Sequence, residues 1–280
     1  MQLRLIRLLT EKNLYVCRFL DAHVLHRMSL KDSVWGVTLL NNELYVLCHG
    51  RVVNHVEVYS TTDYTLLRCL TVPALRKYDA EDMAACQKDN CLYISDAGNN
   101  CIHRLLPNGS ARTWKLPSEP CGLSVTPGGN LLVMCRDETQ NETHKLIEFA
   151  VDEEKLIIVR QIVLQEDILR PCQAVQLTTG HFMVSQRGQS GLCEVNSDGH
   201  VTRIYDDSAK LNCPCHVTID RQDESMFVAD HDNNRVVLLS PSLQFASDVI
   251  ELTLPHRMYF DHMTRRLYVG HGCDVTVVQL

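Results

Sequence analysis

The densest group of potentially reactive side chains lies in residues 212–220, which read NCPCHVTID. Cys213, Cys215 and His216 fall within four residues, and thiolates and imidazoles are the ligands that Zn²⁺ prefers. The chain has 13 cysteines and 13 histidines, so zinc binding and Cys–His nucleophilic catalysis both come into question. No second segment repeats the C-x-C-H spacing to complete a four-ligand set, and no nucleophile motif surrounds any cysteine. We therefore expect no metal and no other cofactor.

Composition restricts the class of protein. The net charge is −7 and the hydrophobic fraction is 45%, which argues against the broadly basic surface of nucleic-acid binders and allows a sizeable core. Residues 1–20 contain five Lys, Arg or Glu residues and lack the apolar region of a signal peptide, and no 20-residue apolar span occurs. We expect reduced cysteines and a cytoplasmic protein that binds neither membrane nor DNA.

The sequence contains a repeated pattern of short apolar segments, and these segments are the elements that would position the cysteines and histidines. A short apolar cluster occurs six times, beginning at Leu44, Leu92, Leu131, Phe182, Met226 and Leu267. Successive starts differ by 48, 39, 51, 44 and 41 residues. Each cluster follows a turn-rich tract, and each tract follows another apolar segment, which begins with proline in four copies: Pro120, Pro171, Pro214 and Pro255. Self-similarity at this period is typical of solenoids and propellers.

Each repeat contains four short apolar runs of alternating or β-branched residues, separated by Gly, Pro, Asn and Asp. Six units of four strands predict an all-β, six-bladed β-propeller with four-stranded antiparallel blades, an arrangement that protects the strand edges. The chain ends at a third strand (275–280), so we expect residues 24–30 to supply the missing fourth strand and close the ring. The propeller would span 24–280, and 1–23 would be an extension or an extra strand.

Two segments carry a resemblance to a known family. LYISDAGNNCIHRLLPNGS (92–110) and MFVADHDNNRVVLLSPS (226–242) resemble the core of NHL repeats. The other blades depart, because Cys48, Cys135, Gln186 and His271 stand where Asp96 and Asp230 occur. The resemblance implies an NHL-type propeller similar to the C-terminal part of tripartite-motif ubiquitin ligases, which serves to recognise protein or, in some members, RNA. It also implies a distant relation to an amidating lyase with metal-binding histidines in its channel.

Six residues of the two NHL-like segments are predicted to be structural. Asx side chains accept backbone N–H bonds in tight turns, which assigns this role to Asp96, Asn99, Asn100, Asp230, Asn233 and Asn234.

In a propeller, the start of each innermost strand and the turn after each second strand lie on one face. The alignment predicts a first ring of Trp35, Glu81, Cys121, Cys172, Cys215 and His256, with Gly36, Asp82, Gly122, Gln173, His216 and Arg257 one step on. A second ring would comprise Cys48, His49, Asp96, Cys135, Arg136, Gln186, Arg187, Asp230, His231 and His271. Such a mixture of Trp, Arg and His is typical of binding hot spots on loops of rigid scaffolds.

We expect a monomeric, non-enzymatic recognition module that binds a protein or peptide around the channel mouth. In a ubiquitin-ligase-like parent protein this module would select the substrate. The predicted contacts are Trp35, His49, Arg136, Arg187, His216, His231, His256, Arg257 and His271. RNA binding by the same face is the alternative. A second alternative is a metal-dependent lyase or hydrolase with its active site in the channel, although cysteines on successive blades would be spread around a wide ring.

Overall fold

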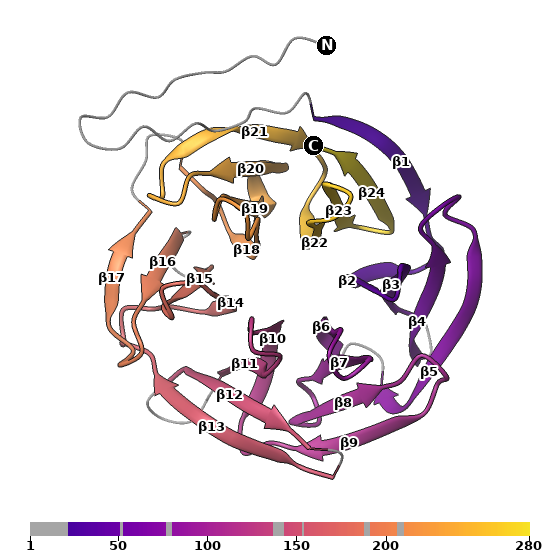
Figure 1. The fold of residues 1–280 in the computed structure, drawn as a ribbon, viewed down its shortest axis with the longest axis horizontal. Helices are drawn as coiled ribbons and strands as arrows, with labels where there is room; N and C mark the ends of the chain where they lie inside the picture. The colour runs from indigo at the N-terminus through magenta and orange to yellow at the C-terminus, as the bar shows by residue number, and fades with distance from the viewer. Residues whose placement is uncertain are drawn as a thin grey trace.

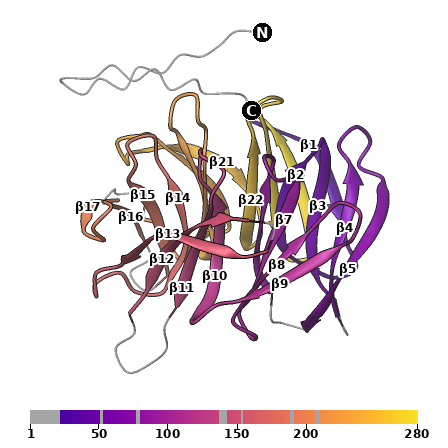
Figure 2. The same cartoon turned by 60° about the horizontal axis from the view of Figure 1, so that its bottom comes forward.

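The repeated apolar clusters form the second strand of each of six sheets, which stand as blades around a central channel (Figure 1). The computed structural model describes residues 22–50, 53–76, 80–136, 143–152, 154–187, 191–205 and 210–280. Every sheet has four antiparallel strands, which run through the thickness of the ring (Figure 2). The predicted six-bladed propeller is confirmed.

Five blades consist of consecutive strands, from the innermost to the outermost. They are β2 (Ser33–Leu40), β3 (Glu43–His49), β4 (Val53–Ser60) and β5 (Leu66–Arg76); β6 (Ala80–Cys86), β7 (Cys91–Asp96), β8 (Cys101–Leu105) and β9 (Ala111–Lys115); β10 (Glu119–Val125), β11 (Leu131–Arg136), β12 (Lys145–Val151) and β13 (Leu156–Val163); β14 (Pro171–Gln176), β15 (Phe182–Gln186), β16 (Gly191–Val195) and β17 (Val201–Ile204); and β18 (Pro214–Ile219), β19 (Met226–Asp230), β20 (Arg235–Leu239) and β21 (Phe245–Glu251). A 3₁₀ turn, η1 (His231–Asn233), follows β19.

The sixth blade closes the ring. It combines β22 (Pro255–Asp261), β23 (Arg266–His271) and β24 (Asp274–Gln279) with β1 (His23–Ser29), which pairs antiparallel with β24 as its outermost strand. This confirms that the N-terminal strand completes the last blade. The predicted extension before it lies, up to residue 21, outside the described residues.

The core is divided into six apolar clusters, each shared by two neighbouring blades. Successive side chains of a strand point to opposite sides of its sheet. In β7, Leu92 and Ile94 therefore pack toward the preceding blade, while Cys91 and Tyr93 pack toward the following one. Burial on both sides explains why the second strands are continuous apolar runs, whereas the outer strand β17 is largely exposed.

Turn chemistry agrees with the sequence pattern. Asn41 and Asn42, between β2 and β3, both have positive φ angles of 52° and 60°, which a two-residue hairpin turn of this handedness requires. Asn tolerates this left-handed region better than most residues, so the LNNE tract defines the register of the first hairpin.

Two further findings concern the cysteines and the helices of the described residues. None of the cysteines among the described residues forms a disulfide. Nor does any helix in the described part of the chain combine the length and the apolar character needed to cross a membrane.

Candidate functional site

The residues of the first predicted ring lie at β-bulges, one near the start of each innermost strand. The register shifts by one residue in β2, β6, β10, β14, β18 and β22 at equivalent points. The residues left without a pairing partner are Trp35, Glu81, Cys121, Cys172, Cys215 and His256. Bulges re-aim side chains and occur next to functional sites, and here six of them surround one end of the channel.

Four rings, one of tryptophan and three of histidine, gather at this end. The Trp35 ring stacks on His49 with centroids 4.3 Å apart, and His256 meets Trp35 edge-on at 4.7 Å. His231, in η1, lies 5.9 Å from His256. Rings from three blades therefore converge at one place. We define the mouth cluster as Trp35, His49, Glu81, Arg136, Arg187, His231 and His256.

The arginines of the mouth cluster are paired unequally. Arg136 lies 2.8 Å from a carboxylate oxygen of Glu119 and 3.6 Å from one of Glu81. Arg187 donates to Nε2 of His256 at 3.2 Å, and none of the carboxylates in the described ranges lies within ion-pair distance of its guanidinium. Arg187 is also exposed. It is thus a cation at the mouth that remains available to an anion.

Below the mouth, four buried polar side chains block the channel. We define Asp82, Gln173, His216 and Arg257 as the plug. Arg257 reaches from β22 to β6, where Nε lies 3.0 Å from Asp82 Oδ1 and a terminal nitrogen donates to the carbonyl of Glu81. Asp82 also accepts from the backbone N–H of Met83 and of Leu123, both at 2.9 Å. The plug therefore joins blades that are not neighbours.

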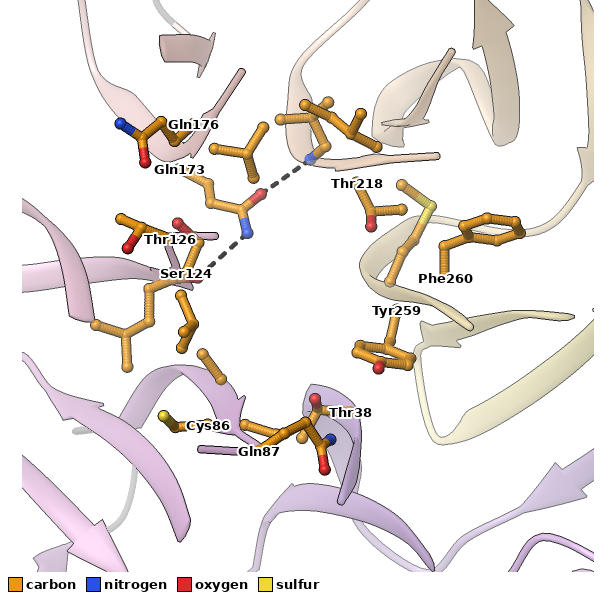
Figure 3. Close-up of a pocket in the computed structure, with 18 of the residues that line it drawn as sticks. Thr38, Cys86, Gln87, Ser124, Thr126, Gln173, Gln176, Thr218, Tyr259 and Phe260 are labelled. Carbon is orange, nitrogen blue, oxygen red and sulfur yellow. Dashed lines mark hydrogen bonds between the residues drawn. The ribbon is translucent and has the colours of Figure 1, made fainter. Parts of the chain in front are cut away.

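Gln173 completes the plug through the backbone of two other blades. Its Oε1 accepts from the N–H of Val217 at 2.9 Å, and its Nε2 donates to the carbonyl of Leu123 at 3.3 Å (Figure 3). The same Nε2 lies 2.9 Å from Nε2 of His216. Both plug residues that the sequence named as contacts, His216 and Arg257, are about 5% exposed, so they lie beneath the surface that a partner would meet.

Three histidines of the site are held neutral. Burial lowers the pKa of His49 to about 4, against the opposing effect of its hydrogen bond to the carbonyl of Ala80. Burial, and next the charge of Arg257, hold the pKa values of His216 and His256 well below 6.5. Nε2 of His256 faces guanidinium N–H groups of both Arg187 and Arg257 at 3.2 and 3.4 Å, and this geometry requires an unprotonated nitrogen.

These pKa values predict acid-sensitive folding. Between pH 7 and 5 the unfolded chain protonates its histidines near pH 6.5 while these three stay neutral in the folded protein, so the unfolded state binds more protons. The free energy of unfolding should fall by about 2 kcal/mol for each such histidine over this range. Urea denaturation at pH 7, 6 and 5 measures it. His49→Phe keeps a ring against Trp35 and should remove about a third of the pH dependence. An unfolding free energy that is constant over this range would contradict the prediction.

The cysteines of the first ring do not share the mouth, contrary to the expectation. Sγ of Cys215 donates to the carbonyls of Pro255 and His256 in the next blade, both at 3.4 Å, and Cys121 donates to the carbonyl of Met134 at 3.3 Å. Both are buried between blades, and only Cys172 is partly exposed. Burial raises the pKa of the Cys172 thiol, while Arg187, Arg257 and Arg136 oppose this.

A different cysteine meets metal-compatible groups. Cys213, His231 and Asp232 each offer a ligand atom, and these atoms lie within 4.8 Å of one another beside the mouth. Cys213 has a positive φ of 56°. It stands outside the repeat, so the repeat pattern assigned it no role. A thiol, an imidazole and a carboxylate are each ligand types of zinc, and three protein ligands are the number that catalytic zinc takes, although Arg187 lies near the thiol and adds positive charge.

The remaining predicted residues lie elsewhere. His271 donates or accepts a hydrogen bond with Thr276 of its own blade at 2.8 Å, and the described interactions do not join it to the mouth cluster. Asp96 accepts from the N–H of Asn99 at 3.0 Å and pairs with His103, and Asp230 accepts from the side chain of Asn233 at 2.8 Å. Asn100 and Asn234 have positive φ angles of 49° and 55°. These contacts are those of turns.

A cavity of about 530 Å³ opens at the opposite end of the channel, where the innermost strands end (Figure 3). Both predicted rings of residues lie at the mouth, so the repeat pattern did not predict this cavity. Its wall includes Thr38, Ser124, Thr218 and Tyr259, from four blades. The plug residues Gln173 and His216 also line it, which places the plug between the cavity and the mouth.

Comparison with known proteins shows the fold and leaves the family open. No family model and no curated protein sequence matches the chain. Among solved structures, virginiamycin B lyase from Staphylococcus aureus is 13% identical, with a TM-score of 0.65 over 93% of this chain and 100% of that one. A gluconolactonase from Xanthomonas campestris is 15% identical, with a TM-score of 0.69 over 91% and 89%. A structure of a nidogen/laminin complex gives 14%, 0.61, 84% and 83%.

The comparisons correct one expectation. We predicted that the chain is not an enzyme, but two of these similar structures are named as a lyase and a gluconolactonase, so the same propeller is used for catalysis. The prediction that a propeller of this kind is not an enzyme is therefore wrong. These comparisons show the propeller but neither NHL repeats nor a tripartite-motif protein.

Proposed function

We propose that the mouth cluster binds a carboxylate-bearing ligand, namely an acidic segment of a partner protein. The observation that carries this proposal is Arg187, an exposed guanidinium that contacts a neutral imidazole and has no described carboxylate within ion-pair distance. A carboxylate can accept two parallel hydrogen bonds from a guanidinium, which gives both strength and orientation. Trp35 beside it, stacked on His49, offers a flat apolar surface for an adjacent side chain.

The charges around Arg187 favour a short acidic segment over RNA. Glu81 and Glu119 lie with Arg136 at the same mouth, and Asp232 is hydrogen-bonded to His231 at 2.6 Å. These carboxylates would repel a continuous phosphate backbone, which requires several uncompensated cations. A single carboxylate needs only one.

The test compares wild type with Arg187→Gln for binding of fluorescein-labelled hexaglutamate. Loss of a charged hydrogen-bonding partner should weaken binding roughly tenfold to a hundredfold. Arg27→Gln is the matched control, since Arg27 is exposed on the outer strand β1 and its removal changes the net charge equally. Fluorescence anisotropy at two salt concentrations measures the affinities.

Two outcomes would contradict this proposal. One is equal affinity of hexaglutamate for the Arg187→Gln and Arg27→Gln variants, which would assign binding to net charge alone. The other is binding of polyuridylate, but not of hexaglutamate, at low salt, which would favour the RNA alternative.

Catalysis at the same mouth is the second candidate function. A carboxylate that takes the guanidinium of Arg187 would remove one of the two guanidinium groups that face Nε2 of His256, and so would make this neutral imidazole a better proton acceptor. Cys213, His231 and Asp232 would hold a zinc ion, if one binds, and the ion would polarise an oxygen of the ligand. The zinc content of protein dialysed against zinc and then against buffer distinguishes this candidate from binding alone.

The family relationship and the cellular location that the sequence suggests are also part of this proposal. The NHL and tripartite-motif relationship rests on the two motif-bearing blades, and a ubiquitin-ligase parent would use the mouth to select its substrate. A cytoplasmic location is supported by the thiol state of the described cysteines, none of which forms a disulfide.

A further inference from the structure

The cavity opposite the mouth has the size of a ligand site. Its volume of about 530 Å³ lies within the roughly 300–1,000 Å³ typical of small-molecule pockets. Apolar side chains such as Val217 and Met258 form much of the wall, and hydroxyl groups are placed at intervals between them (Figure 3). The plug closes its inner end, so a ligand here would not reach the mouth cluster.

The charge of the lining is one-sided. Lys88 and Arg221 both line the cavity, while none of the described lining residues is an aspartate or glutamate, although the whole chain has a net charge of −7. No carboxylate of the described residues forms an ion pair with either cation. The neighbouring Asp220 is already engaged, because it is paired with Arg265 and accepts the N–H of Gln222 at 3.0 Å. The two cations are therefore not neutralised.

Gln173 and His216 close the inner end of the cavity as a fixed hydrogen-bonded pair. The contacts of Gln173 with Val217 and Leu123 fix its amide so that the NH₂ group faces Nε2 of His216. Nε2 of His216 is therefore an acceptor, and the neutral ring must carry its proton on Nδ1. His216 is 6% exposed, and its Nδ1 has no partner among the described residues. This nitrogen is enclosed by protein, so a ligand in the cavity would touch the His216 ring but would not reach its Nδ1–H.

We propose that this cavity binds a small organic anion with an apolar body. Arg221 and Lys88 attract the anionic group, and the apolar wall covers the rest of the ligand. Tyr259 adds a hydroxyl donor, since burial first and Asp261 next raise its pKa to about 12 and keep it protonated. This site is separate from the mouth and does not depend on the function proposed there.

The experiment uses 7-methoxycoumarin-4-acetate, a fluorescent carboxylate with a largely apolar body, and its uncharged methyl ester. We expect saturable binding of the carboxylate in fluorescence anisotropy, and about tenfold weaker binding of the ester. Arg221→Gln and Lys88→Gln should each weaken binding of the carboxylate about tenfold, and should leave binding of the ester unchanged. Lys31 is exposed and precedes β2, and Lys31→Gln is the control that changes the charge equally. This variant should bind both probes as the wild type does.

Three results would overturn this inference. The first is equal binding of the acid and its ester, which would mean that the cations play no part. The second is loss of binding in Arg187→Gln together with full binding in Arg221→Gln, which would place the probe at the mouth. The third is an unchanged His216 imidazole resonance at saturation in the ¹⁵N-histidine spectrum, which would exclude the contact at the inner end. A shift of that resonance is the expected result.

Discussion

Asp82→Asn should lower the free energy of unfolding by about 3–5 kcal/mol. Asp82 and Arg257 are 1% and 5% exposed, and the substitution leaves the guanidinium buried without its counter-ion. The new amide can also accept only one of the N–H bonds from Met83 and Leu123 that the carboxylate accepts. Because the pair joins β22 to β6 across the channel, its loss should loosen blades that have no direct strand pairing.

Urea denaturation of Asp82→Asn and of a matched variant, Asp248→Asn, tests this prediction. Asp248 forms an ion pair with Arg235 at 3.0 Å but is 53% exposed, so its loss should cost less than about 1 kcal/mol. The double variant Asp82→Leu with Arg257→Met should lose less stability than the sum of its single substitutions, because apolar residues can replace a buried ion pair. A cost of Asp82→Asn no larger than that of Asp248→Asn would refute the role of the plug.

Gly122→Ala should cost about 3 kcal/mol or more, at or beyond the upper end of ordinary overpacking. A Cβ at this position would lie 2.0 Å from the carbonyl oxygen of Cys172 and 2.8 Å from Cα of Gln173. Both neighbours are backbone atoms of β14, so no side-chain rotation relieves the contact. Either β10 and β14 separate, which displaces Gln173 from the plug, or the blade does not form.

Gly128→Ala is the matched control from the turn after the same strand. A Cβ there would meet only Oγ1 of Thr126, at 3.8 Å, and the change should alter stability by less than about 0.5 kcal/mol. Equilibrium unfolding of both variants, monitored by intrinsic fluorescence, provides the comparison. Equal stability of the two variants would show that β10 and β14 are not held as closely as the structure indicates.

The two ends of the channel differ in the kind of ligand they could accept. The mouth cluster contains acids and bases side by side, with Arg187 as the cation that remains unpaired among the described residues. The opposite cavity contains cations and neutral donors, and none of its described lining residues is an aspartate or glutamate. Because the plug separates them, a ligand at one end would influence the other only through the plug hydrogen bonds.

The sequence by itself determined the number of blades, the strands and the closure. Each blade is packed on both sides, so the middle of its second strand must be apolar on both faces, and that requirement recurs six times as a visible pattern. Turn residues such as Asn41 and Asn42 follow from local backbone conformation and could be predicted for the same reason. The final strand pairing of β1 with β24 followed from counting strands.

The tertiary structure decided which side chains meet. The sequence placed Cys215 and His256 in equivalent slots, but Cys215 turns into the contact with the next blade while His256 faces the mouth, because carbonyl acceptors of the next blade lie within reach of the thiol. Arg257 reaches Glu81 over a sequence separation of 176 residues. The repeat pattern fixes how each blade is built, whereas the direction of a side chain at a bulge depends on distant blades, and only the closed ring brings those together.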